Sequence, residues 1–433
     1  MILLQNFKNV VRIPELLRKL VFTLGVLVVF RIGTFIPVAG VNITQLAEFI
    51  KSSEGIGGLL RYFDIFSGGA LSQCTIFALG IGPYITASII LQILSIGIPA
   101  LEELSKEGEY GRKMVNQYAR YLALVLSVLY SGGLLTLLEY HNLVLTPGLA
   151  FRAFFMLTIA TGAMVVMWLG EQISLFGLGS GSSVLIFASI AARLPHNVAS
   201  TIDAVRLGNM SVIAALIVLM IFLAVAGCIV FLEKGERKVP VQYARRVVGN
   251  RVYGGQNTFI PFKLNSAGVM PAIMTSSALN LPIFIAGALA SKFTALNSFV
   301  QAMNVGGFLY NCLTFALIIF FAYVYTSVIF NPLELADNLK KGGGFIPGIR
   351  PGRQTAEYFD YLLTRIGLVG AIYLGVLVLM PNILEAVVRL PFSLGGTSLL
   401  ILIGVALELA SQVESYLIEY RYGSFLVSGR VKG

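Results

Sequence analysis

The residues of this chain that could do chemistry are few, and the most suggestive of them are glycines. GLGSGSS at residues 177–183 has no strand pattern before it, and KKGGGFIPGIRPG at residues 340–352 lacks the Gly-Lys-Ser/Thr ending of a phosphate-binding loop. Both stretches are more typical of turns. In the second, Pro347 and Pro351 stiffen the backbone on either side of Arg350, which predicts a shaped, protruding loop.

Cysteine and histidine are equally sparse. Cys74, Cys228 and Cys312 lie far apart, each in an apolar block, so neither a disulfide framework nor a metal cluster is predicted. His141 and His196 have no cysteine or second histidine at ligand spacing. Because no nucleophile is paired with a base, we expect no enzymatic activity, no cofactor and no metal. Any driven process must draw its energy from another molecule.

The composition of the chain predicts that its residues are held in place by membrane-spanning helices. The 433 residues are 57% hydrophobic and 12% charged, with a mean hydropathy of +0.83, against roughly 25% charged residues in a soluble domain. A helix needs about 20 apolar residues to cross a bilayer, and apolar blocks recur along the whole chain. We predict ten spans, near residues 20–38, 72–97, 115–138, 150–170, 183–199, 211–232, 267–290, 309–330, 363–384 and 393–412.

The net charge of +10 is concentrated in two long loops, residues 233–265 and 331–362. Lys and Arg are enriched in cytoplasmic loops, so this asymmetry places both loops and the N-terminus inside the cell. The charge could serve only to set topology, but topology does not require such long loops. The first residues predict an amphipathic helix on the membrane surface. The tail from residue 414 could continue the last helix or lie along the surface.

Ionisable side chains are rare at membrane depth. Arg31, toward the outer end of the first span, and Arg193, toward the outer end of the fifth, stand out. Ion-coupled transporters keep such groups for function, so a pump or symporter is not predicted. Two function classes remain: a passive conduit worked by a cytoplasmic partner, and a facilitative carrier for small solutes. The large basic loops favour the conduit, because a carrier needs no docking platform.

Six long motifs are spread in order along the chain. They are FRIGTFIPVAG (30–40), FSGGALSQCTIFALGIGPYITASIILQIL (66–94), WLGEQIS (168–174), QYARRVVGNRVYGGQNTFIPFKLNSAGVMPAI (242–273), FNPLELADNLKKGGGFIPGIRPG (330–352) and GGTSLLI (395–401). Together they resemble the bacterial SecY family, the channel subunits of the Sec protein-conducting translocon. The similarity runs from about residue 11 to residue 411.

The resemblance implies an all-α channel of ten transmembrane helices in two pseudo-symmetric, inverted halves of five, at residues 1–200 and 201–412, with a cytoplasmic tail at 413–433. It also explains why the apolar run at residues 59–98 has a polar middle. In this family a short plug half-helix, here about residues 57–69, precedes a full second span, and Gly68 and Gly69 can end that helix. The plug residues are Leu60, Arg61, Tyr62, Phe63, Asp64, Ile65 and Phe66.

A constriction ring of isoleucines is implied at the waist of the channel. Bulky side chains without hydrogen-bonding groups tend to dewet a narrow pore and so exclude hydrated ions, yet they yield to a passing polypeptide. Ile81 and Ile85 are four residues apart and share a helix face. Ser182 is atypical, because the family usually has an aliphatic residue there. The ring positions are Ile81, Ile85, Ile186, Ile273 and Ile401.

A lateral gate is implied where the second and third spans meet the seventh and eighth. Pro271 and Pro282 are expected to break the seventh span on this wall. The gate would let a signal peptide or an apolar segment leave sideways into lipid. Its residues in this chain are Thr86, Ile90, Asn280 and Leu281.

The two basic loops match the family's docking surface for the ribosome and the Sec motor ATPase. Guanidinium groups bind phosphate and carboxylate in a bidentate way, which suits such a surface. The predicted contacts are Arg245, Arg246, Arg251 and Arg350. Implied partners are the SecE and SecG subunits, the motor ATPase, the ribosome, signal peptides, nascent or preprotein chains and membrane lipid. The implied location is the bacterial inner (plasma) membrane, with both termini cytoplasmic.

Overall fold

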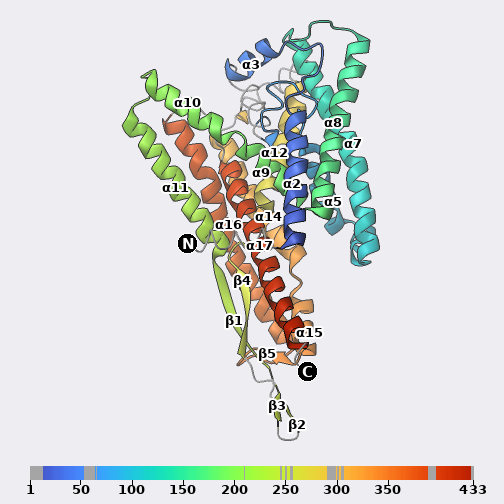
Figure 1. The fold of residues 1–433 in the computed structure, drawn as a ribbon, viewed down its shortest axis with the longest axis vertical. Helices are drawn as coiled ribbons and strands as arrows, with labels where there is room; N and C mark the ends of the chain where they lie inside the picture. Colours follow the sequence, from blue (N-terminus) through green and yellow to red (C-terminus); the bar gives the residue numbers. More distant parts are fainter. Residues whose placement is uncertain are drawn as a thin grey trace.

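Long helices form a bundle with a small β-sheet at one end (Figure 1). The computed structural model describes the backbone of residues 13–52, 64, 66–208, 210–243, 246–248, 251–253, 257–289, 299, 302–303, 307–388 and 396–430. The first helices are α2 (Pro14–Gly33), α3 (Ile43–Ser52), α5 (Gly82–Gly97), α6 (Pro99–Lys106), α7 (Glu109–Tyr140), α8 (Leu149–Phe176), α9 (Gly181–Ala191) and α10 (Leu194–Arg206). They are followed by α11 (Val212–Lys234), α12 (Met270–Leu289), α14 (Phe308–Ile329), α15 (Pro332–Lys341), α16 (Arg353–Val388) and α17 (Gly396–Arg430).

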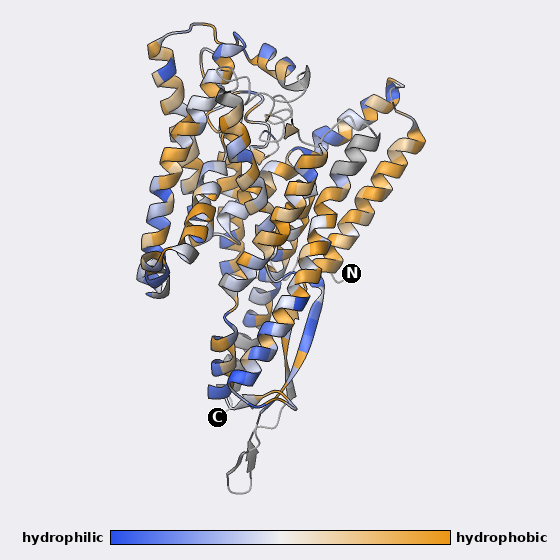
Figure 2. Ribbon diagram, turned by 180° about the vertical axis from the view of Figure 1, so that it is seen from behind, coloured by the Kyte–Doolittle hydropathy of each residue, from blue (hydrophilic) through white to orange (hydrophobic). Residues whose placement is uncertain are grey.

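Apolar faces on the outside of the bundle indicate that lipid is its solvent. Six helical stretches among the described residues, in α7, α8, α11, α14, α16 and α17, are long and apolar enough to cross a membrane. On α11, Ile213 and Phe231 are each 72% exposed. Contiguous apolar faces of this kind are rare on soluble proteins. Figure 2 shows hydrophobic residues along the helices and hydrophilic ones gathered toward the end that carries the strands.

The helices pack in two groups that meet in the middle of the molecule. α5 packs on α7 and α7 on α8, while α12 packs on α14 and α14 on α16. The groups join where α9 contacts α17 and where α12 contacts α5 and α7. One apolar core cluster runs through this junction and includes Phe30 of α2, Ile229 of α11 and Ile318 of α14. The core therefore ties the first half of the chain to the second.

The second predicted span is helical only from Gly82 onward. Residues 67–81 form turns, broken by an isolated bridge between Thr75 and Pro37. Gly68 and Gly69 have positive φ of 68° and 95°, as their expected role at the end of a helix requires. The expectation of a full helix over residues 72–97 is therefore wrong for its first part. The backbone amides there are satisfied by turns and by a neighbouring segment instead of a helical ladder.

The fifth predicted span, residues 183–199, is also interrupted. α9 ends at Ala191, and α10 begins at Leu194 with a proline in its first turn. Pro195 has no backbone N–H to continue the helical hydrogen bonds of α9. One continuous helix over this range was the wrong prediction, because two helices meet at Arg193.

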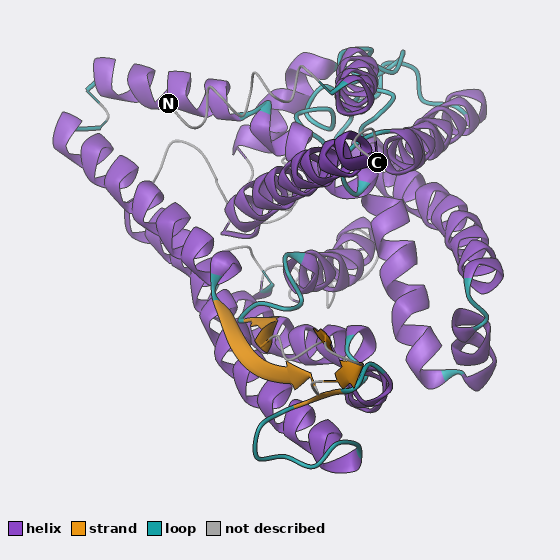
Figure 3. Ribbon diagram, turned by 60° about the horizontal axis from the view of Figure 1, so that its bottom comes forward, coloured by secondary structure: helices purple, strands orange, loops and turns teal. Residues whose placement is uncertain are grey.

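The long loop after α11 is a β-hairpin. β1 (Glu236–Tyr243) pairs antiparallel with β4 (Asn257–Lys263), and β2 (Arg246–Val248) pairs with β3 (Arg251–Tyr253). β5 (Gly344–Phe345), from the second predicted loop, joins the other edge of β1 and gives the order β4-β1-β5. The all-α prediction is therefore wrong at this end, where the strands lie beside the helices (Figure 3).

Alternating burial explains why this hairpin is a stable sheet. Val239 and Val241 of β1 are buried, whereas Lys238 faces solvent, as the period of two along a strand requires. Their apolar face packs on Ala336 of α15 and Phe359 of α16. The two basic loops thus form one folded unit, which we call the strand platform. At the same end of the molecule, the tail continues α17 as far as Arg430.

Candidate pore and gate

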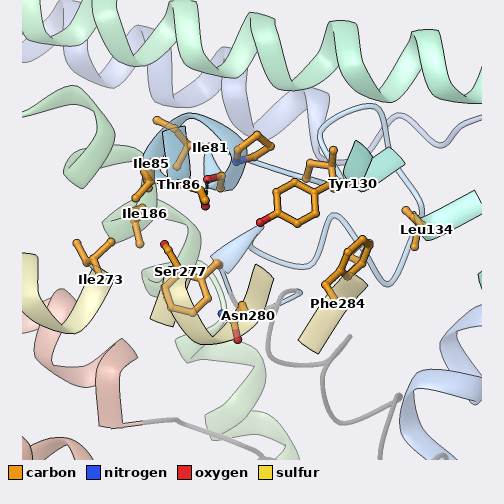
Figure 4. Close-up of a pocket in the computed structure, with 16 residues that line it drawn as sticks. Ile81, Ile85, Thr86, Tyr130, Leu134, Ile186, Ile273, Ser277, Asn280 and Phe284 are labelled. Atoms are coloured by element: carbon orange, nitrogen blue, oxygen red, sulfur yellow. Dashed lines mark hydrogen bonds between the residues drawn. The ribbon is translucent and has the colours of Figure 1, made fainter. Parts of the chain in front are cut away.

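A cavity of about 70 Å³ lies where the two groups of helices meet. Ile81 precedes α5, Ile85 lies in its first turn, Ile186 comes from α9 and Ile273 from α12, and all four line the cavity. Figure 4 shows these isoleucines together on one side of the cavity. Ile401 of α17 is fully buried in the same apolar cluster but does not line the cavity. The structure therefore brings four of the five predicted ring residues to one wall.

Close packing of α8 against α9 holds Ile186 in this position. A Cβ on Gly181 would lie 1.7 Å from the carbonyl oxygen of Gly170, so α8 and α9 can approach this closely only with glycine there. The Gly181 amide also donates to Ser174 Oγ at 2.8 Å. Ser182 is not among the cavity residues, and its Oγ lies 3.1 Å from that of Ser180.

The predicted plug is partly within the described residues. Phe66 lines the cavity and packs against the apolar core cluster, and Asp64 is 3% exposed. The remaining plug residues, Leu60, Arg61, Tyr62, Phe63 and Ile65, lie outside the described residues. An aromatic ring from the segment just before the turns thus reaches the same space as the isoleucines.

Polar and aromatic residues form the opposite side of the cavity. Thr86 of α5 lies near Ser277 and Asn280 of α12, between the isoleucines and the aromatic rings of Tyr130 and Phe284 (Figure 4). Tyr130 of α7 and Phe284 of α12 pack edge to face, with ring centroids 5.2 Å apart and an interplanar angle of 71°. This pair was missed from the sequence, because an aromatic residue in an apolar run gives no sign of which neighbour it contacts.

The other predicted gate residues flank this contact. Ile90 is partly buried beside α7, and Leu281 lies in α12 with its side chain outside the described part of the structure. Asn280 Oδ1 is buried and accepts no hydrogen bond from any described group. Pro282 lies inside α12 as expected, but Pro271 is at the helix start and does not break it. A buried amide of this kind is easily rehydrated when helices part.

Three of the four predicted docking arginines lie in described parts of the two basic loops that form the strand platform. Arg350 is exposed, and its carbonyl accepts a hydrogen bond from Thr355 Oγ1 at 2.9 Å. Gly348 and Gly352, on either side, have positive φ of 85° and 106° and shape the protruding loop. Arg246 and Arg251 lie in the paired strands β2 and β3, for which only the backbone is described, and Arg245 lies outside the described residues.

Two membrane-depth arginines contact the segment that the sequence assigns to the plug, which no sequence pattern had indicated. Arg193 forms an ion pair with Asp64. Arg31 Nη1 donates to the carbonyl oxygen of Gly68 at 3.0 Å. Within the described residues, no group of three His, Cys, Asp or Glu side chains could hold a metal ion.

Comparison with known proteins gives consistent results. The family model described as SecY matches residues 75–410. The protein translocase subunit SecY of Escherichia coli (strain K12) is 44% identical over 428 residues, covering 97% of this chain and 96% of that protein. The corresponding subunit of Thermotoga maritima is 39% identical over 441 residues, with 99% of each chain covered.

Solved structures share the fold at low sequence identity. A structure described as a protein conducting channel has a TM-score of 0.68 at 16% identity, with 92% of each chain covered. Sec61 in the canine ribosome-channel complex from the endoplasmic reticulum has a TM-score of 0.66, again at 16% identity and 92% coverage of each.

Proposed function

Because this chain belongs to the SecY family, we propose that the cavity between its two groups of helices is the closed waist of a protein-conducting channel. The chain is the pore-forming subunit of a Sec translocon, and unfolded polypeptides cross the membrane through it. The observation that supports this site most directly is the meeting of Ile81, Ile186 and Ile273 from separate elements around one small cavity, with Phe66 beside them. No feature of the site favours a small-solute carrier.

Ten spans fit the helices of this chain. Besides the six long apolar helices, α5 and α12 are shorter apolar helices, and α2 has 20 residues. α9 has 11 residues and is extended by α10. Counted in order, these ten place the strand platform and the C-terminal end of α17 on the same side. We assign that side to the cytoplasm of a bacterial inner membrane, where basic loops are enriched, with the halves at residues 1–200 and 201–412 as an inverted pair.

The isoleucine wall is the seal of the resting channel. Aliphatic side chains offer water and ions no hydrogen bonds, so a narrow collar of them dewets. A threading chain displaces them through dispersion contacts, which are weak individually and do not depend on sequence. Phe66 adds bulk to the same space and must leave it when the chain passes. The channel therefore passes polypeptides of any sequence but excludes hydrated ions at rest.

The gate opens between α12 on one side and α5 and α7 on the other. A signal peptide that enters there contacts Thr86 and Asn280 and displaces the packed rings of Tyr130 and Phe284. Its transfer to lipid is worth about 25 cal/mol per Å² of apolar surface. Burial of the arriving segment thus supplies the free energy that separates the two groups of helices.

The strand platform is the docking surface for the partners that drive transport. The Sec motor ATPase and the ribosome bind here, and SecE and SecG complete the membrane complex. Arg350 is exposed on a loop shaped by Gly348 and Gly352. Among solved structures with this fold, Sec61 and the yeast Ssh1 complex are described as bound to ribosomes.

Photocrosslinking tests the assigned pore directly. A photoreactive amino acid replaces Thr86 or Ile90 in the complex with SecE and SecG, and a precursor is stalled partway in proteoliposomes by a folded domain at its end. We expect crosslinks to the signal sequence at both positions. The same amino acid at the lipid-exposed Ile213 is the control and should give no crosslink. Absence of crosslinks at Thr86 and Ile90, together with saturable uptake of a small solute by the chain alone, would favour the carrier.

Replacement of Arg350 tests the docking surface. Arg350→Glu reverses the charge of an exposed side chain and removes no buried contact, so the protein should insert and unfold as the wild type does. We expect motor-driven translocation to fall at least about 100-fold, because bidentate pairing to carboxylate is lost and replaced by repulsion. Arg353→Glu, at a neighbouring exposed arginine that pairs with Glu357 at i+4, is the matched control. Normal precursor transport by the Arg350 variant would remove this residue from the docking surface.

A further inference from the structure

The two arginines at membrane depth converge on one short segment. The carboxylate of Asp64 pairs with Arg193, and its Oδ1 accepts the amide of Ser72 at 2.8 Å. Arg31 Nη1, from α2, donates to the carbonyl oxygen of Gly68 at 3.0 Å. Two different elements of the channel wall therefore hold the same loop, described at residues 64 and 66–69, by charged hydrogen bonds.

The backbone of this loop is shaped to fit against the wall. Gly68 and Gly69 both have positive φ. A Cβ on Gly68 would lie 3.1 Å from Ser189 Cα of α9, and a Cβ on Gly69 would lie 3.4 Å from Arg193 Nη2. The loop thus runs directly over the end of α9, and Arg193 reaches it from the junction where α9 gives way to α10. Because the fifth predicted span is interrupted at Arg193, the guanidinium of this residue lies beside the loop.

Burial increases the effect of the Asp64–Arg193 ion pair on the position of the loop. Asp64 is 3% exposed, and the Arg193 side chain is 24% exposed. A buried charge that loses its partner is strongly destabilised, because water cannot replace the lost interaction. Displacement of the loop separates Asp64, which moves, from Arg193, which stays in the wall. The pair therefore favours the position in which Phe66 occupies the cavity.

We propose that Arg193 and Asp64, assisted by Arg31, form an ionic latch that holds the plug in the resting channel and sets the threshold for its release. This inference rests on the proposed channel function. Arg193 and Arg31 are positioning residues, since they act on the pore through the loop. A signal peptide or threading chain must break the latch before the waist can open.

Resting ion conductance in planar bilayers measures the latch, with the chain in its complex with SecE and SecG. Asp64→Asn and Arg193→Gln should each raise the resting leak about tenfold, the factor that corresponds to about 1.4 kcal/mol. The reciprocal exchange Asp64→Arg with Arg193→Asp should return the leak to within about threefold of the wild type, because opposite charges are again adjacent. Asp203→Asn and Arg206→Gln, exposed residues of α10, are matched controls and should leave the leak unchanged.

A double-mutant cycle with neutral side chains tests the latch even if the charge-exchanged variant fails to fold. The neutral double variant Asp64→Asn with Arg193→Gln leaves no buried charge unpaired, so its leak should be smaller than the product of the two single effects. Single variants that leak like the wild type, or two effects that simply multiply, would overturn the latch. Failure of the channel function itself has a different signature: wild-type complex would then show no added conductance when a stalled precursor is released from it.

Discussion

At the residue scale, the five predicted ring isoleucines do not all occupy the same place. Ile81, Ile85, Ile186 and Ile273 line one cavity, whereas Ile401 lies behind them in the core. Residue type and spacing do not distinguish an isoleucine in a pore wall from one that faces lipid. The assignment of these residues came from the resemblance to the family motifs. Ser182, the atypical position where the family usually has an aliphatic residue, does not line the cavity.

Replacing a ring isoleucine with a polar residue should open the seal to ions. Ile273→Asn replaces a branched aliphatic side chain with a smaller one whose amide binds water, so the collar no longer dewets. We expect the resting conductance in planar bilayers to increase about tenfold, as for a change of about 1.4 kcal/mol in the sealing equilibrium.

The control for this measurement is Ile273→Val, which shortens the side chain by one methylene and adds no polar group. Its leak should stay within about threefold of the wild type, because the collar remains entirely aliphatic and still dewets. Equal conductance of the Asn and Val variants would show that Ile273 is not part of the seal.

At the scale of elements, hydropathy predicted where helices lie but not where they begin. The turns at residues 67–81 are as apolar as the helix that follows, and their conformation depends on positive φ at Gly68 and on the bridge between Thr75 and Pro37. The strand platform was predicted as loops, because three of its strands have three residues or fewer and one pairing joins segments about 100 residues apart. Contacts over such distances leave no local pattern to detect.

The pairing of β5 with β1 should be required for docking. A Cβ on Gly344 would lie 2.7 Å from Leu339 Cδ1 of α15 and 3.1 Å from Tyr243 Cε1 of β1. We therefore expect the larger side chain of Gly344→Val to crowd both neighbours and to weaken the pairing of β5 with β1. We expect the loop that carries Arg350 to be displaced and motor-driven translocation to fall at least about tenfold. Limited proteolysis should show new cleavage within residues 342–352.

Gly342→Ala is the matched control for this change. Gly342 has φ of −72°, and its Cβ would approach Asn338 O no closer than 3.4 Å, which is ordinary contact. Transport and protease resistance should match those of the wild type. Unimpaired transport by the Gly344 variant would mean that the platform docks its partners without β5.

At the scale of the whole molecule, two groups of helices meet along a junction that is apolar on one side of the cavity and partly polar on the other. The buried Asn280, with Oδ1 unpaired among described groups, lies beside the ring contact of Tyr130 and Phe284. Such a junction is stable when closed, yet it contains a group that gains hydrogen bonds when water or a peptide enters. We therefore propose that the gate lies at the partly polar side of the junction.

Removing one ring from the gate contact should lower the threshold for opening. Phe284→Ala loses an edge-to-face pair worth about 0.5–1.5 kcal/mol beyond its burial. We expect precursors with a defective signal sequence to be transported about 2 to 10 times better than by the wild type. Phe231→Ala, at a lipid-exposed position of α11, should leave this selectivity unchanged, and an equal effect of both substitutions would argue against the gate.

Cysteine crosslinking at the waist tests the central claim, that these isoleucines part around a moving polypeptide. In a chain whose three native cysteines are replaced by alanine, cysteines are placed singly at Ile81 and at Ile273, with Ile213→Cys on the lipid face of α11 as the control. A precursor carrying one cysteine is stalled midway. We predict disulfide formation at both waist positions and none at residue 213. Crosslinking that is absent from both waist positions while the precursor is protected inside the membrane would contradict it.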